Sequence, residues 1–292
     1  MYPSRFAYEA PTSVAEAIAL LDQSGGEAKI LAGGQSLVPM LKLRFASPER
    51  LVDINNIEGL RYHRIDGEGN LHIGALCRHE DLEFSEILSD TFPTLAHAAA
   101  LVADPIVRTR GTFVGSVCHA DPQGDWAATM VALGGRIVAQ GPNGKREIDV
   151  RDFVLGPFTT ALAYNELAIE AVIPAPKGTA RGGYLKLERR VGDFATASVA
   201  VALDMNGVTV TRAGCALAGV GGRTIDANDA IGGALNGKTL TADTIEAAAN
   251  AVAETAEPRT DHRGSAEYKR HIVKTFVTRI LNNIAAQEQK AA

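Results

Sequence analysis

The sequence predicts a mixed α+β protein, in which a βαβ-like opening leads to a C-terminal antiparallel sheet covered by helices. Strand and helix signals alternate at the start of the chain, and a stretch rich in Pro, Gly and Ala at 173–183 marks the best domain boundary. Beyond it, period-two alternation is followed by helical segments. We therefore expect a first domain over residues 1–177, with subdomains at about 1–56 and 57–177, and a second over 178–292.

The opening segment carries clear helix and strand signals. A hydroxyl at Ser13 followed by Glu16 predicts a helix start, and Gly25 and Gly26 predict its end. Apolar runs at 28–32 and 51–54 predict strands. After Pro39, residues 40–44 fit either a short helix or an extended edge.

The middle of the chain combines hairpins and helices. Turn residues 66–70 divide two strand-like segments within 61–75, and residues 142–144 do the same within 136–150. Helical patterns cover 80–88, 92–101 and 126–133, and we expect Trp126 to anchor the last of these against the core.

Beyond the boundary, apolar residues at every second position predict a half-buried strand over 195–203. A turn at 205–207 leads to a second strand over 207–217. Helical patterns at 225–235, 242–254 and 266–284 complete the chain.

Composition excludes several classes of protein. Apolar residues make up 46% of the 292 residues and charged residues 22%, as in ordinary soluble chains. The net charge is −5 and the basic residues are scattered, which argues against a nucleic-acid binder. No apolar signal core follows the N-terminus and no run approaches about 18 apolar residues, so we expect a cytoplasmic protein without a membrane span.

Cysteine and histidine spacing predicts no metal site. Cys77, Cys118 and Cys215 form no CxxC pair, and an iron–sulfur cluster usually takes four thiolates. The seven histidines make no HxxxH arrangement. Cys118 and His119 adjoin, but neighbours in sequence are seldom catalytic partners, and we predict no catalytic residue.

Two glycine-containing loops, 32–36 and 111–116, stand out. Successive backbone N–H groups in such a turn can face the negative charges of a diphosphate. Neither loop contains Lys or Arg, so stabilisation must come from the backbone and from polar side chains. Taken singly, each loop indicates only a tight turn, and the spacing excludes the Rossmann and P-loop motifs.

The loops lie within longer stretches that resemble one protein family. Residues 31–44 resemble the first flavin motif of the FAD-binding medium subunits of the carbon monoxide dehydrogenase and xanthine dehydrogenase family, the molybdenum hydroxylases, and 110–125 resemble the second. Residues 183–187 and 189–195 resemble that family's flavin-facing strand, and 261–270 its closing helix signature. The likeness covers nearly the whole chain, with its motifs in the family's order.

The resemblance implies a vanillyl-alcohol-oxidase-type (PCMH-type) FAD-binding fold. It implies that the two loops hold the diphosphate, that Tyr184 or Lys186 lies near the isoalloxazine, and that Asp121 or Asp125 accepts a hydrogen bond from ribityl or ribose hydroxyls. The cofactor-binding residues it implies are Ala32, Gly33, Gly34, Gln35, Ser36, Leu37, Gly111, Thr112, Phe113, Val114, Gly115, Ser116, Asp121, Asp125, Tyr184, Lys186 and Asp193.

Some of these positions have alternative readings. Asp193 is equally typical of a turn, and Tyr184 of a half-buried strand aromatic. Val114 stands where the family usually has a glycine. If that position requires a positive φ, the valine costs about 1–3 kcal/mol, and flavin is held more loosely or the loop takes another path.

The resemblance also implies a function. It implies an oxidoreductase subunit that binds FAD, receives electrons from the [2Fe–2S] clusters of a small partner and passes them to an external acceptor. A large partner with molybdopterin oxidises the substrate, in a dimer of heterotrimers. Two alternatives are a free-standing flavin oxidase or reductase of the same fold, and a binding module that has lost flavin. The substrate and the acceptor are not specified by this chain.

Overall fold

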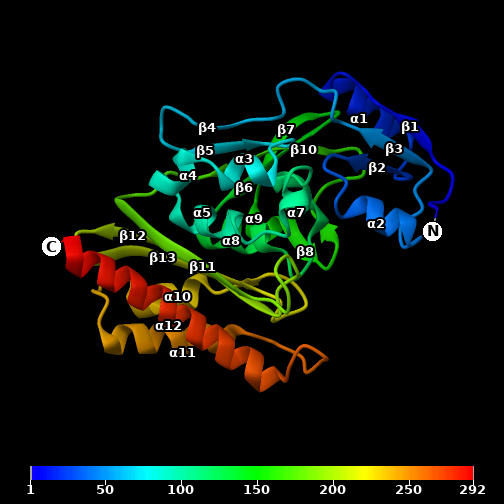
Figure 1. Ribbon diagram of the computed structural model, residues 1–292. Helices are drawn as coiled ribbons and strands as arrows, with labels where there is room; N and C mark the ends of the chain where they lie inside the picture. The colour runs from blue at the N-terminus through cyan, green and yellow to red at the C-terminus, as the bar shows by residue number, and fades with distance from the viewer. Residues whose placement is uncertain (1, 292) are drawn as a thin grey trace.

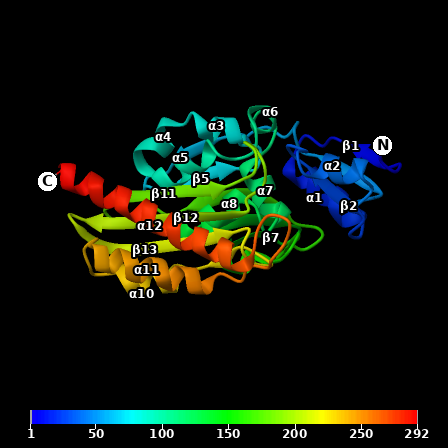
Figure 2. The same cartoon turned by 60° about the horizontal axis from the view of Figure 1, so that its bottom comes forward.

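The computed structural model of the chain describes residues 2–291 and confirms a mixed α+β architecture (Figure 1). Within these residues the strands form a small N-terminal sheet, a central five-stranded sheet, a C-terminal four-stranded sheet and a two-stranded hairpin. The C-terminal sheet lies between helices of the central part and three C-terminal helices (Figure 2).

The N-terminal sheet is parallel, in the order β1-β3-β2, as the βαβ-like opening predicted. The Ser13 hydroxyl accepts from the N–H of Glu16 at the start of α1, which confirms the predicted helix start. Residues 40–44, which the sequence left undecided, form the end of a helix and its exit. The elements are β1 (Ala7–Glu9), α1 (Val14–Gln23), β2 (Ala28–Leu31), α2 (Leu37–Lys42) and β3 (Arg50–Asp53).

The central sheet is antiparallel, in the order β4-β5-β10-β6-β7. Both predicted hairpins are confirmed, whereas β10, the middle strand, was not anticipated. The strands are β4 (His63–Ile65), β5 (Leu71–Gly74), β6 (Arg136–Gly141), β7 (Gly144–Asp149) and β10 (Leu167–Ile173), with the hairpin β8 (Val154–Gly156) and β9 (Thr159–Thr160).

Short helices connect these strands. The helix expected at 80–88 is two helices, because the chain turns at Phe84 and the Ser85 hydroxyl caps a new start. The elements are α3 (His79–Glu83), α4 (Glu86–Thr91), α5 (Pro93–Ala99), α6 (Pro105–Arg108), α7 (Phe113–His119), α8 (Asp125–Leu133) and α9 (Val150–Phe153).

The C-terminal part is an antiparallel sheet with three helices on one face. The expected helix at 225–235 begins instead with a short strand. The predicted boundary, 173–183, is reduced to a linker at 174–178, since strands occupy both of its ends. The elements are β11 (Thr179–Leu187), β12 (Ala197–Asn206), β13 (Thr209–Ala218), β14 (Ile225–Asp226), α10 (Asn228–Leu235), α11 (Ala242–Thr255) and α12 (Ala266–Ala291).

The prediction that the strand at 195–203 is half-buried is wrong, because β12 is buried on both faces. Val199 and Val201 face α10–α12, whereas Ala200 faces α5 and α8 of the central part. The alternation therefore separates Val199, Val201 and Leu203 from small buried side chains, both apolar and hydroxyl-bearing, on the other face. Small residues are needed on the second face, since a Cβ on Gly214 would overlap the carbonyl oxygen of Ala132 in α8.

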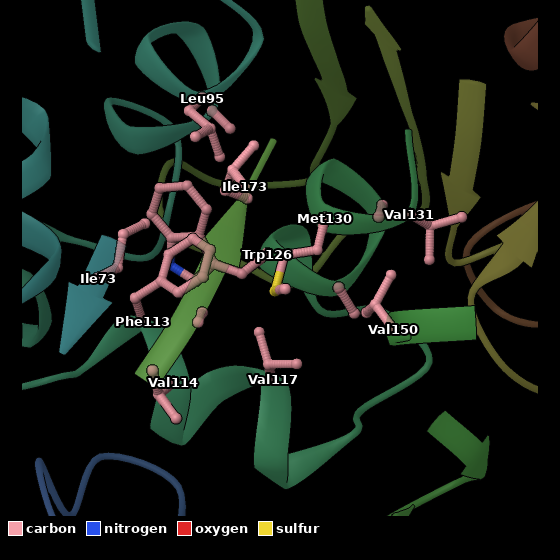
Figure 3. Close-up of a cluster of buried hydrophobic side chains, with 14 of the residues drawn as sticks. Ile73, Leu95, Phe113, Val114, Val117, Trp126, Met130, Val131, Val150 and Ile173 are labelled. Atoms are coloured by element: carbon pink, nitrogen blue, oxygen red, sulfur yellow. The ribbon is translucent and has the colours of Figure 1, made fainter. Parts of the chain in front are cut away.

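The largest core cluster surrounds Trp126, which is fully buried and anchors α8 as predicted (Figure 3). The ring of Phe113 packs against it, with ring centroids 4.7 Å apart. Val114 and Val117 belong to the same cluster. Part of the second motif is therefore core. None of the helices described here has the length and apolar character to cross a membrane.

Candidate cofactor site

The two glycine-containing loops lie directly against each other. A Cβ on Gly33 would overlap the carbonyl oxygen of Arg110 and come within 2.8 Å of the Cα of Gly111. A Cβ on Gly115 would lie 4.0 Å from the Cβ of Ala32. Segments about 80 residues apart in sequence therefore meet through their backbones, and only glycine at position 33 permits this approach.

The first loop presents unpaired backbone donors. Within the described part of the chain, the N–H groups of residues 33–36 donate to no acceptor. Gly34 has a φ of +76°, a left-handed conformation that turns the chain from β2 into α2. Ser36 precedes Leu37, the first helical residue, and its hydroxyl makes no capping bond. These donors and this hydroxyl are available to an anionic ligand.

The second loop is mostly the first turn of α7. The Thr112 hydroxyl caps this helix by accepting from the N–H of Gly115 at 3.2 Å, and Ser116 follows in the same turn. A Cβ on Gly115 would overlap that hydroxyl, so glycine preserves the cap. The N–H groups of Thr112 and Val114 have no acceptor among the residues described.

The backbone at Val114 is not strained, because its φ is not positive. It is a helical residue of α7, 2% exposed, and is absent from the non-glycine residues with positive φ. Its side chain packs with Phe113 and Val117 in the core around Trp126. The valine side chain therefore packs in the core beneath the second loop. Its backbone is helical, so the cost of about 1–3 kcal/mol that a positive φ would bring does not arise.

His79 supports the second loop from behind. Its backbone N–H donates to the carbonyl of Gly111, 3.0 Å away, and its ring occupies the space that a Cβ on Gly111 would need. The Trp126 indole N–H donates to Nδ1 of His79, 2.9 Å away, so the neutral ring carries its proton on Nε2. Burial, together with Arg108 and Arg78, lowers the pKa of His79 to about 4.

Arg78 and Asn55, which the sequence reasoning missed, join the bases of the two loops. Arg78 Nη1 donates to the carbonyl of Arg110 and Nη2 to Oδ1 of Asn55, both at 2.6 Å. Asn55 Nδ2 in turn donates to the carbonyl of Ala32 at 2.8 Å. The only signal in sequence was an arginine directly after the short apolar stretch 73–77.

Asp125, Tyr184 and Lys186 form a buried network between the central part and β11. The Tyr184 hydroxyl donates to Oδ1 of Asp125 at 2.5 Å, and Lys186 Nζ lies 3.3 Å from Oδ2. Lys186 also donates to the carbonyl of Leu101 at 2.6 Å. Tyr184 is 2% exposed and the Lys186 side chain 1%, so protein encloses both.

Burial of this network raises the pKa of two of its members. Burial raises the pKa of Asp125 against the opposing effect of Lys186. Burial, together with the Asp125 carboxylate, raises the pKa of Tyr184 well above its usual value. Asp125 thus binds both Tyr184 and Lys186 within the protein.

The remaining candidates lie in turns. Asp121 is half-buried between α7 and α8, where its carboxylate accepts from the N–H of Gln123 at 2.9 Å. Asp193 is exposed, and its N–H donates to the carbonyl of Arg190. The low polarity around Cys118 raises the pKa of its thiol to about 12, which is unsuited to a nucleophile.

Comparisons with known proteins agree over the whole chain. Residues 4–176 match the FAD binding domain in molybdopterin dehydrogenase, and residues 183–284 match the CO dehydrogenase flavoprotein C-terminal domain. The carbon monoxide dehydrogenase medium chain of Hydrogenophaga pseudoflava is 43% identical, over 97% of this chain and 98% of its own. The glyceraldehyde dehydrogenase medium chain of Sulfolobus acidocaldarius is 35% identical, over 98% and 100%.

A solved structure shows the same fold. Carbon monoxide dehydrogenase from Hydrogenophaga pseudoflava, in a form that lacks the Mo-pyranopterin moiety of its cofactor, superposes with a TM-score of 0.92 at 45% identity. The match covers 97% of this chain and 98% of that one. The chain therefore belongs to the FAD-binding medium subunits of the carbon monoxide dehydrogenase and xanthine dehydrogenase family, the molybdenum hydroxylases.

Proposed function

We propose that this chain binds FAD where its two glycine-containing loops meet and acts as the electron-transfer subunit of a molybdenum hydroxylase. The unpaired N–H groups of residues 33–36, beside those of Thr112 and Val114, are the observation that carries the proposal. They fit a diphosphate, because unpaired backbone N–H groups in two adjoining glycine-containing turns are suitable donors to phosphate oxygens. Residues 32–37 and 111–116 would contact this part of the cofactor.

The two domains would divide the work of holding the cofactor. Residues 1–177 supply both loops, and residues 178–292 add a sheet whose strand β11 carries Tyr184 and Lys186. We propose that the network of these residues with Asp125 fixes β11 against α8, and that Asp121 and Asp193 bind from the turns at the edge of the site. The bound flavin would supply the redox chemistry; the residues of this chain bind it, orient it and exclude water.

The electron path would require partner chains. The three cysteines are widely separated in sequence, and Cys77 and Cys215 are fully buried in different core clusters. An iron–sulfur cluster usually takes four thiolates, so we place the [2Fe–2S] clusters on a small partner and molybdopterin on a large one, as a dimer of heterotrimers. Electrons would pass from the clusters through FAD to an external acceptor. The names of the relatives, which describe medium chains, support this assignment.

Flavin content of the purified protein tests the proposal. We expect about one FAD per chain from absorbance near 450 nm and from chromatography of the released cofactor. Larger and smaller chains should copurify from the native source. A colourless chain that also fails to take up added FAD would overturn the flavin assignment, and a lone yellow protein that oxidises an alcohol would favour a free-standing oxidase.

Gly33→Ala tests the loops themselves. The added Cβ would overlap the backbone of Arg110, so the loops must separate and FAD retention should fall to a small fraction of wild type. Gly67→Ala is the matched control, since a Cβ there meets nothing within 4 Å and its φ is not positive. Full flavin content in Gly33→Ala, or equal loss in both variants, would contradict the assignment of these loops.

A further inference from the structure

We propose that Arg78 is a positioning residue of the diphosphate site, which holds the two loops together and supplies the positive charge that neither loop contains. This inference rests on the proposed function and goes beyond it, because it assigns the affinity for the diphosphate partly to a side chain outside both loops. Three observations carry it: the hydrogen bonds of the guanidinium, its burial, and the lack of an anionic partner.

The hydrogen bonds fix the direction of one loop donor, the N–H of Gly33. The carbonyl of Ala32 accepts from Asn55, which itself accepts from Arg78, and the carbonyl of Arg110 accepts from Arg78 directly. In a trans peptide the C=O and N–H groups point in opposite directions. Since the Ala32 carbonyl is turned toward Asn55, the N–H of Gly33 points to the opposite side, where a ligand can accept from it.

Among the residues that the structure describes, the buried guanidinium has neutral partners only. Arg78 is 8% exposed, and burial lowers its pKa from the usual value, although an arginine in a protein keeps its proton. Its two side-chain acceptors are a backbone carbonyl and an amide oxygen. No ion pair formed by the residues described includes Arg78.

The nearby carboxylates are committed elsewhere. Asp81 pairs with both Arg61 Nε and Nη2, at 3.0 and 2.7 Å, and accepts from the backbone N–H of Arg78. Asp53 accepts from Asn55 and from the Tyr8 hydroxyl. The guanidinium of Arg110 adds a second positive charge nearby. A buried cation without an anionic partner is costly, and a bound diphosphate would provide the missing negative charge.

Arginine suits this position better than lysine. Its planar guanidinium reaches two acceptors in fixed directions at once, here the Arg110 carbonyl and Asn55. Lysine would keep the charge but not this fork. Glutamine would lose both the charge and the fork. Comparing the lysine and glutamine variants can therefore separate the effect of loop positioning from the effect of the positive charge.

The test titrates flavin-free protein, as the full chain, with FAD by quenching of flavin fluorescence at several NaCl concentrations. We expect Arg78→Gln to raise the Kd by at least about tenfold and to flatten its dependence on salt. Arg78→Lys should also weaken binding but keep the salt dependence. Arg64→Gln is the control, because it removes an exposed charge that lies over the Tyr62 ring and not at the loops.

Inorganic pyrophosphate as a competitor gives a second readout. It should compete with FAD for wild type and for Arg64→Gln, and much less effectively for Arg78→Gln. Wild-type FAD affinity and salt dependence in Arg78→Gln would overturn the inference while leaving the proposed function intact. Wild type that binds no FAD would overturn the proposed function. If circular dichroism shows that Arg78→Gln is unfolded, Arg78→Lys decides, and wild-type affinity in that variant overturns the inference.

Discussion

Val114 shows how one residue changes meaning when its neighbours are known. In sequence it is a departure from a glycine pattern, with a backbone cost if its φ were positive. In the fold it is a buried helical residue beside Phe113 and Val117. Its role is therefore packing, and the second glycine-containing loop does not depend on a glycine there.

A glycine at position 114 should accordingly lower the stability of the protein. Val114→Gly removes a buried side chain and adds a flexible residue to a helix, so the free energy of unfolding should fall by about 2–3 kcal/mol. Urea denaturation measures this, with Val191→Gly as the control because Val191 is 87% exposed. FAD should not bind more tightly to Val114→Gly; tighter binding would restore the view that the valine hinders the cofactor.

His79 makes the free energy of unfolding depend on pH. Its folded pKa of about 4 lies below the ordinary 6.5, so the folded protein holds a neutral ring while the unfolded chain takes up a proton. The stabilising contribution is complete above about pH 6.5 and is lost as pH falls toward 4. Its size is up to about 3 kcal/mol.

Denaturation at a series of pH values checks this contribution. In His79→Asn the amide oxygen lies at the position of Nδ1 and can accept from Trp126 but does not titrate, so the loss of stability between pH 6.5 and 4 should be smaller than in wild type. Carboxylates titrate in the same range in both proteins, and the difference between the two curves isolates the histidine. Parallel curves would show that the ring does not stay neutral on folding.

At the scale of elements, the site depends on how strands and helices end. Loop 32–36 connects the parallel strand β2 to α2, and the second loop is capped by Thr112 at the start of α7. Both loops stood out in the sequence through their glycines. The Thr112 cap and the helix that follows it were not predicted, since Val114 and Val117 are poor helix formers that only tertiary packing favours.

The Thr112 cap offers a direct test at this scale. Thr112→Ala removes the hydroxyl that accepts from Gly115 and should lower the free energy of unfolding by about 1 kcal/mol. Thr112→Ser keeps the acceptor and should remain close to wild type. Urea denaturation distinguishes the two, and equal stability of the alanine and serine variants would show that the cap contributes nothing.

At the scale of the whole molecule, a buried ion pair joins the two parts of the chain. Lys186 on β11 lies against Asp125 on α8, within a contact where Gly182 and Gly214 allow helices to approach the sheet. Such a pair is weak support for stability in itself, because both charges lose water. Breaking it is costly, because one charge remains buried.

Removing only Lys186 should therefore lower the free energy of unfolding more than removing the charges of both Lys186 and Asp125. Lys186→Met leaves the Asp125 carboxylate buried and should lower the free energy of unfolding by about 3 kcal/mol. The double variant Lys186→Met, Asp125→Asn should recover part of that loss, since the amide can still accept from Tyr184, whereas Glu188, which also lies 3.3 Å from Lys186 Nζ, keeps its charge without this partner. A double-mutant cycle by urea denaturation gives the coupling. A double variant no more stable than the single one would refute the ion pair as the cause.

Several local features of this protein follow from short stretches of its sequence. The Ser13 cap, both hairpins of the central sheet, the glycine loops and the three C-terminal helical segments follow from residues within a few positions of each other. The loops could also be matched to a family, because their motifs are contiguous. These features need no knowledge of distant segments.

Contacts between distant groups, in contrast, depend on how the whole chain folds. Asn55, Arg78 and Arg110 lie in three separate segments, and no local pattern marks them as one hydrogen-bonded chain. Strand β10 became the centre of a sheet, and β12 was buried on both faces, through neighbours far away in sequence. Burial and the pairing of charges depend on what the rest of the chain places nearby, and no window of sequence contains that information.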